Sequence, residues 1–153
     1  MYELGGIISD FDVIIINGTA LKELQRKAEC VLSLENDFVN AGFNSCIKKS
    51  TFVEKWLNGY YTAYRHKSWM YNASHRPRTI LKANDTCYNM HVVPNIAMDP
   101  NFSGYKKWLM KNGVQWRKKI AAHYFNKRLK NSNEAALQAD NSFGEMLRYI
   151  YNA

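Results

Sequence analysis

The chain has 153 residues, and its hydrophobic content of 46%, with 14% aromatic residues, is enough for one buried core. Its formal net charge of +8 favours a negatively charged partner, and no apolar run approaches the roughly 18 residues that a membrane span needs. We therefore predict a single domain over residues 1–153 without a membrane span.

The cysteines and the amino-terminal residues predict the cellular compartment of the protein. Cys30, Cys46 and Cys87 are an odd number and show neither a CxxC pair nor metal-ligand spacing, which is typical of reduced, buried thiols. The first residues lack the basic start and apolar run of a secretion signal. These features predict a soluble, intracellular protein, in the cytoplasm or within a virus particle.

The first predicted element is a strand. Residues 6–16 are rich in isoleucine and valine, and they are followed by Asn17-Gly18, a pair typical of tight turns. At least one strand is expected, best at residues 12–16. Its consecutive isoleucines indicate burial on both faces, either under helices or at a subunit contact.

Two long helices are predicted between residues 19 and 70. The first runs from Thr19, as N-cap, to about residue 41, with Gly42 as its stop. The second begins at the capping box Thr51-Phe52-Val53-Glu54 and continues toward Met70. Aromatic residues of the second helix either stack on unpaired bases beside its cations or form a core, and we favour the core for most of them. The first helix is indicated by Leu21, Leu24, Ala28, Val31 and Phe38, which repeat at helical spacing.

The middle of the chain predicts a loop and a hairpin. Proline restricts both itself and its predecessor, so His75-Arg76-Pro77-Arg78 is expected to interrupt the helix. Residues 79–82 and 87–93 then predict a short hairpin that ends at Pro94.

A third long helix is predicted over the most basic stretch, residues 105–130, starting near Pro100. Arg117 and Arg128 fall within its apolar arc, so they extend to water along their stems or meet an anionic partner. Shorter helices are expected at residues 134–139 and from Ser142. The predicted fold is α+β and predominantly helical, with three long helices and a C-terminal helical segment packed with a short N-terminal strand and a central β-hairpin.

The positive charge is concentrated in the chain's centre. Fifteen of the 21 basic residues, but only two acidic ones, lie between residues 55 and 130. This predicts a basic surface that contacts nucleic acid or an acidic protein, without strong sequence specificity because no helix-turn-helix, zinc-finger or RNP-like pattern occurs. The candidate nucleic-acid contacts are Arg65, Lys67, Arg76, Arg78, Lys106, Lys107, Arg117, Lys118 and Lys119.

Motifs for catalysis are missing from the sequence. It contains no phosphate-binding GxxxxGK[ST] loop, no GxGxxG and no GxSxG, and its four histidines share no metal-ligand spacing. We therefore predict a non-enzymatic protein without a cofactor or metal. Asp10 and Asp12 could form a carboxylate pair, and Asp85 with His91 leaves a metal-dependent nuclease as a minor alternative.

The last third of the chain provides an alternative function. It reads YKKWLMKNGVQWRKKIAAHYFNKRL, then an Asn-rich break, then EAALQADNSFGEMLRYI. This pattern resembles the helical end of phage head-to-tail adaptor proteins. The resemblance implies a homo-oligomer or a subunit of a larger assembly such as a virion, and it transfers no functional residue.

Overall fold

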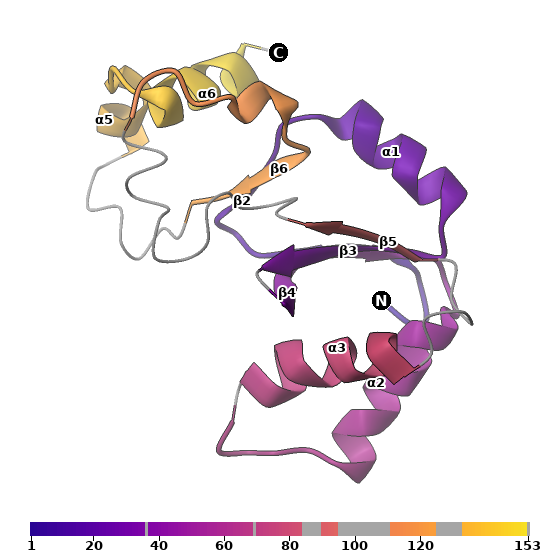
Figure 1. The fold of residues 1–153 in the computed structure, drawn as a ribbon. Coiled ribbons are helices and arrows are strands. Elements are labelled where there is room, and N and C mark those ends of the chain that lie inside the picture. Colours follow the sequence, from indigo (N-terminus) through magenta and orange to yellow (C-terminus); the bar gives the residue numbers. More distant parts are fainter. Residues whose placement is uncertain (36, 69, 84–89, 95–110, 125–132, 153) are drawn as a thin grey trace. The chain divides into compact units, whose positions relative to one another are not determined.

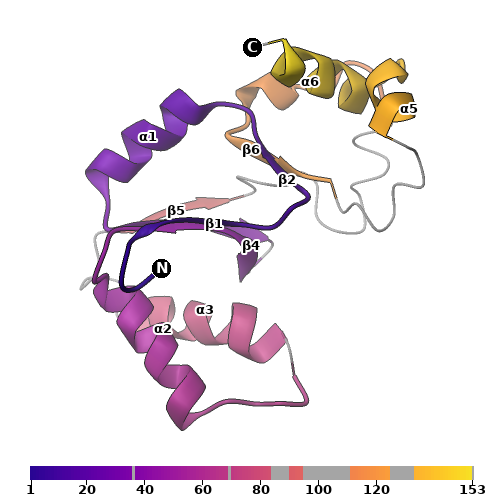
Figure 2. The same cartoon turned by 180° about the vertical axis from the view of Figure 1, so that it is seen from behind.

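The computed structural model describes residues 1–35, 37–68, 70–83, 90–94, 111–124 and 133–152 (Figures 1 and 2). The chain forms two compact units, and each is built from two separate stretches. The first unit comprises Met1–Asp10 and Leu21–Pro94, and the second comprises Phe11–Ala20 and Asn95–Ala153. The single domain over residues 1–153 stays a prediction, and the units are described in turn.

A four-stranded sheet, in the order β1-β4-β3-β5, organises the first unit. The hairpin of β3 (Cys30–Glu35) and β4 (Phe38–Cys46) is antiparallel, and β1 (Gly6–Ser9) adds to it antiparallel to β4. The fourth strand, β5 (Met90–Pro94), pairs with β3 in parallel. Helices α2 and α3 lie on one face of this sheet (Figure 1). Their shared core comprises Cys30, Leu32, Leu34, Val39, Cys46, Phe52, Val53, Ile80 and Leu81.

The first helix, α1 (Gly18–Lys27), is much shorter than predicted. Asn17, rather than Thr19, caps it, because the Asn17 side chain accepts a hydrogen bond from the Ala20 amide at 2.9 Å. The predicted extension to residue 41 is wrong, since residues 30–46 form the hairpin and Gly42 lies inside β4. The central strand β3 is buried on both faces, so its apolar residues do not alternate and also fit helical spacing.

A disulfide joins the two ends of this hairpin. Cys30 and Cys46 are directly opposite each other in the β3–β4 register, with their Cα atoms 4.1 Å apart, and they form a disulfide bond. The prediction of reduced thiols is wrong for this pair, whereas Cys87 lies outside the described residues. The cysteine pattern therefore no longer supports an intracellular setting.

The second predicted helix is confirmed at its start, where α2 spans Thr51–Thr62. Its cap is Ser50 instead of the predicted Thr51, because the Ser50 hydroxyl accepts from the Val53 amide at 3.2 Å. The helix ends eight residues before Met70, so its predicted length is wrong.

The loop and hairpin predicted after residue 75 are wrong, but the second of the two predicted strands, residues 87–93, is confirmed in part by β5. A π-helical turn, η1 (Tyr71–His75), leads directly into α3 (Arg76–Ala83). Pro77 follows this π-helical turn, and the Asn72 carbonyl accepts from Trp56 Nε1 at 2.8 Å. Residues 79–82 therefore belong to a helix, and β5 pairs with β3 instead.

A two-stranded sheet and short helices form the second unit. β2 (Val13–Ile15) confirms the strand predicted at residues 12–16 and pairs antiparallel with β6 (Ala121–His123). The predicted C-terminal helices are confirmed as α5 (Asn133–Gln138) and α6 (Ser142–Tyr151), with Asn141 as the cap of α6. The core of this unit contains Trp116, Ala122, Ala136, Phe143 and Met146.

The predicted basic helix is wrong wherever the structure describes it. Within residues 111–124 the chain forms only a 3₁₀ turn, η2 (Trp116–Lys118), and then β6. Gly113 has a φ of 73°, which is incompatible with a right-handed helix, and Trp116 is buried. The remainder of the predicted helix, including Arg128, lies outside the described residues.

The fold class therefore needs correction. The described α-helices have only six to twelve residues, and they accompany two small sheets. The fold is α+β, and the prediction of a predominantly helical protein with three long helices is wrong. Among the described residues, no helix has both the length and the apolar character required to cross a membrane.

Candidate nucleic-acid interface

Helix α2 exposes a row of apolar side chains, which we call the tyrosine stripe: Leu57, Tyr60, Tyr61 and Tyr64. Their exposed fractions are 40%, 42%, 80% and 56%, in that order. The spacing of three, four and seven residues places them along one side of the helix, with Tyr64 just beyond its end. Singly exposed apolar residues are common, but a row of four is a candidate binding surface.

The adjoining side of α2 supplies the core. Phe52 and Val53 are buried there, and Trp56 packs against the same cluster. Gly59 lets α3 approach closely, because a β-carbon at this position would lie 2.8 Å from Arg76 Nε. The helix thus carries two apolar rows, and the expectation that most of its aromatic residues form a core is wrong for the three tyrosines.

The rings of the tyrosine stripe are arranged for stacking. Tyr60 and Tyr64 stack with their centroids 5.8 Å apart and an angle of 29° between their planes. Partial burial, and secondly the neighbouring Tyr64, raise the pKa of the Tyr60 phenol above its ordinary value. A tyrosine is uncharged at neutral pH even at its ordinary pKa, so this ring does not repel an anion.

Positive charges follow the stripe immediately. Arg65, His66 and Lys67 are all exposed, and the Arg65 guanidinium lies 3.8 Å from the centroid of the Tyr71 ring. The buried Asn72 fixes the backbone at this point, since it accepts from the Arg65 amide at 3.0 Å and donates to the Arg65 carbonyl at 2.9 Å. Two of the predicted nucleic-acid contacts, Arg65 and Lys67, therefore adjoin the aromatic row.

Of the other two predicted contacts of this unit, Arg78 has a carboxylate partner and Arg76 is partly buried. Arg78 donates to Asp37 from Nη2 at 2.6 Å and from Nε at 3.2 Å, and Lys82 contacts the same carboxylate at 2.8 Å. Arg76 packs its Nε atom against Gly59. These side chains join α3 to the hairpin turn and to α2, so they contribute less to a free basic surface.

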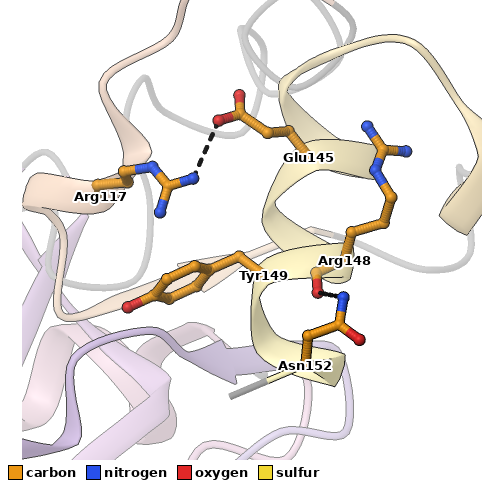
Figure 3. A pocket seen from close by; sticks show the side chains of 5 residues that line it. All are labelled: Arg117, Glu145, Arg148, Tyr149 and Asn152. Atoms are coloured by element: carbon orange, nitrogen blue, oxygen red, sulfur yellow. Dashed lines mark hydrogen bonds and ion pairs between the residues drawn. The ribbon is translucent and has the colours of Figure 1, made fainter.

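Arg117, in the second unit, is held on several sides (Figure 3). Its guanidinium lies 4.4 Å from the ring centroid of Trp116 and 4.6 Å from that of Tyr149, and Nη2 is 3.2 Å from Glu145 Oε1. The predicted anionic partner is thus a carboxylate of the protein itself. A pocket of about 330 Å³ adjoins this group, lined by Arg117, Glu145, Arg148, Tyr149 and Asn152.

The remaining cations near this pocket differ in their surroundings. Arg148 Nη1 donates to the Leu137 and Ala139 carbonyls, at 2.5 Å and 3.0 Å, and so holds the end of α5. Lys118 is exposed and Lys119 is partly buried. The predicted contacts Lys106 and Lys107 lie outside the described residues.

One pair of titratable groups was not predicted from the sequence. The buried His123 on β6 contacts Asp12 Oδ1 through Nε2 at 3.1 Å, across 111 residues of chain. No local motif connects two residues so far apart, and only the β2–β6 pairing brings them together. Asp10, the other predicted carboxylate, ends the first stretch of the first unit. Asp85 lies outside the described residues, and the backbone of His91 belongs to β5.

The structure thus distributes the predicted contacts over two units, and of those in the first unit only Arg65 and Lys67 adjoin an exposed aromatic row. No protein-family model, no curated protein and no solved structure matches this chain.

Proposed function

We propose that this protein binds single-stranded nucleic acid, without strong sequence specificity, through the tyrosine stripe and the cations that follow it. The observation that supports this function is the exposure of Tyr60, Tyr61 and Tyr64 directly before Arg65 and Lys67. Ring faces can stack on successive bases while the cations neutralise the adjoining phosphates.

Single strands fit this surface better than duplexes. In a duplex the faces of the bases are stacked on each other, whereas unpaired bases offer a free face to an aromatic side chain. Each stacked base contributes roughly 1 to 3 kcal/mol, and every base has such a face, so binding tolerates different sequences. We propose binding rather than catalysis, since ring faces and cations hold a strand without activating a nucleophile.

A tyrosine substitution tests the stacking contribution. Tyr61→Ala should weaken binding of a short labelled single strand about 5- to 150-fold in fluorescence anisotropy, because one stacked base is worth roughly 1 to 3 kcal/mol. The matched control is Tyr151→Ala, since Tyr151 is 82% exposed and lies on α6 in the other unit. Equal effects of both substitutions, or none from either, would contradict stacking at this stripe.

A charge reversal tests the phosphate contribution. Arg65→Glu together with Lys67→Glu should reduce the steepness of the log–log salt dependence by about 1.4, because each phosphate contact on a single strand contributes roughly 0.7. Lys22→Glu with Arg26→Glu, two exposed cations of α1, supplies a control with the same change in net charge. If both pairs lower the salt dependence equally, the effect is that of net charge and the proposed surface is rejected.

A second candidate function, a subunit of a larger assembly, is favoured by the edge of the sheet. Among the described residues β1 pairs only with β4. Its residues Ile7 and Ile8 are 43% and 49% exposed to solvent. Open apolar edges of this kind readily pair with another chain. A ring-sized mass in light scattering, together with undetectable nucleic-acid binding at low salt, would favour this candidate over the first.

A further inference from the structure

An open surface cavity of about 450 Å³, lined mostly by exposed residues, lies at the amino-terminal end of the tyrosine stripe. This volume is within the range of small-molecule sites, roughly 300 to 1,000 Å³. Two residues of the stripe, Leu57 and Tyr61, belong to its wall, so a strand that stacks on the stripe passes the cavity. All the lining residues lie in the first unit: Tyr2, Glu54, Lys55, Leu57, Asn58 and Tyr61.

The acceptor in this cavity is the Glu54 carboxylate. Its Oε1 atom accepts a hydrogen bond from the Tyr2 hydroxyl at 3.2 Å. Desolvation, and secondly this hydrogen bond, raise the pKa of the Tyr2 phenol, so Tyr2 remains a donor at neutral pH. Glu54 is exposed, and its second carboxylate oxygen, Oε2, is a further acceptor that a ligand can reach.

Hydrogen-bonding groups, rather than net charge, decide which part of a nucleotide the cavity favours, because Glu54 and Lys55, which have opposite charges, both line it. Arg65 and Lys67, at the other end of the stripe, attract phosphate. An ionised carboxylate only accepts hydrogen bonds, so it favours a group that donates N–H. Cytosine, adenine and guanine carry an exocyclic amino group, whereas thymine donates only through N3–H, which lies between two carbonyl oxygens that repel a carboxylate.

We propose that this cavity takes one unpaired base with an exocyclic amino group, which donates to Glu54 while the base packs against Tyr61 and Leu57. The inference rests on the proposed function and adds a modest base preference to it. Asn58, on the same wall, offers both a donor and an acceptor to the edge of the base.

Oligo(dC) and oligo(dT) of equal length test this base preference. Both are pyrimidines, and at ring position 4 the first carries an amino group where the second carries an oxygen. At neutral pH the protein should bind oligo(dC) about 2- to 13-fold more tightly in fluorescence anisotropy, the net effect of one hydrogen bond to the base.

Glu54→Gln should abolish this difference. The glutamine oxygen still accepts from Tyr2, but its amide group can donate to the thymine oxygen and no longer presents a charged acceptor. The control is Glu23→Gln, which removes the same charge from an exposed position on α1 and should leave the dC-to-dT ratio unchanged. The ratio is a suitable readout because a purely structural role of Glu54 in the first turn of α2 would change both affinities together.

The possible outcomes separate the two proposals. Equal binding of oligo(dC) and oligo(dT) by the unmodified protein would reject the base pocket and leave the proposed function standing. Absence of binding to either strand at low salt would reject the proposed function itself. A ratio that persists in Glu54→Gln, with a native circular dichroism spectrum, would assign the preference to another residue and overturn the role of Glu54.

Discussion

The tyrosine stripe and the Arg117 group contain similar residue types in different arrangements, although Arg65 and Arg117 both lie against an aromatic ring. On α2 the rings are exposed, and the cations Arg65 and Lys67 follow them. Around Arg117 the guanidinium lies against Trp116 and Tyr149, and Glu145 pairs with it at 3.2 Å. Glu145 therefore offsets the charge of Arg117, whose side chain is still 56% exposed, and makes it less available to an anionic ligand.

The largest expected effect comes from the removal of the disulfide, which should distinguish the unit that carries the tyrosine stripe from the unit that carries Arg117. Removing the Cys30–Cys46 bond by Cys30→Ala with Cys46→Ala should destabilise the first unit by about 3 kcal/mol, because the bond closes a loop with a sequence separation of 16. Hydrogen exchange should become faster in β3 and β4 and stay unchanged in β2 and β6. Cys87→Ala is the control, since it leaves this disulfide in place.

The stripe itself should respond to the same change. Cys30 Sγ lies 3.3 Å from the Ser50 hydroxyl, and Ser50 caps the helix that carries the tyrosines. Weaker single-strand binding by the double variant is therefore expected at temperatures where the first unit begins to open. Equal exchange in both units would show that the crosslink does not stabilise the first unit selectively.

Two arginine truncations sharpen the comparison. Arg117→Ala should lower the free energy of unfolding by about 1 to 2 kcal/mol, because it removes two ring contacts and a partly exposed ion pair, and it should leave binding nearly unchanged. Arg65→Ala should reduce affinity at 0.1 M salt by roughly fivefold, the effect of one phosphate contact, with a smaller loss of stability. Urea unfolding measures the stability of both variants, and fluorescence anisotropy on the same samples measures their affinity for the single strand. The opposite pattern would reverse the roles assigned to the two arginines.

The smallest expected effect is the pH dependence of the α3 contact with the hairpin turn. Hydrogen bonds from Lys82 first and Arg78 second hold the pKa of Asp37 below its usual 3.8. A carboxyl group whose folded pKa is depressed stabilises the fold above its unfolded pKa, and this contribution is lost as the pH falls through the folded value. Stability should therefore decline below about pH 4, and less so in Asp37→Asn. An identical acid transition in the variant would show that Asp37 makes no contribution.

Local signals were sufficient for part of the fold. The strand β2, the start of α2 and the helices α5 and α6 were predicted because turn residues, caps and apolar spacing all lie within a few positions of one another. The caps still differed by one residue at Ser50 and Asn141, where either neighbour has a side chain able to accept the hydrogen bond.

Other elements depend on distant partners that the sequence does not identify. The segment Cys30–Glu35 fits a helix as well as a strand until β4 and β5 are known to lie on either side of it. The basic segment has helical spacing, yet Ala121–His123 pairs with β2, which precedes it by more than a hundred residues. In both cases tertiary pairing outweighs weak local propensity.

The candidate site was predicted only in its charges. Arg65 and Lys67 were identified by composition, but the sequence did not show that the tyrosines beside them are exposed. Residues 52, 53 and 56 and residues 57, 60, 61 and 64 form two rows with the same helical spacing. Only the packing of α2 against the sheet and α3 decides which of the rows faces solvent.

The interleaving of the two units affects how the protein is made. The chain passes from one unit to the other after Asp10, after Ala20 and after Pro94. On the ribosome, β2 emerges long before β6 has been synthesised, so this apolar strand remains unpaired until β6 has been made. Unpaired strand edges in nascent chains are prone to aggregate.

The same connectivity limits how the gene can be divided. A fragment that ends at residue 94 would retain β2 without β6, and a fragment that begins at residue 95 would lack β2. No single cut therefore yields two complete units. Co-expression of the second fragment with a peptide that supplies residues 11–20 would restore its sheet, in the manner of a split protein.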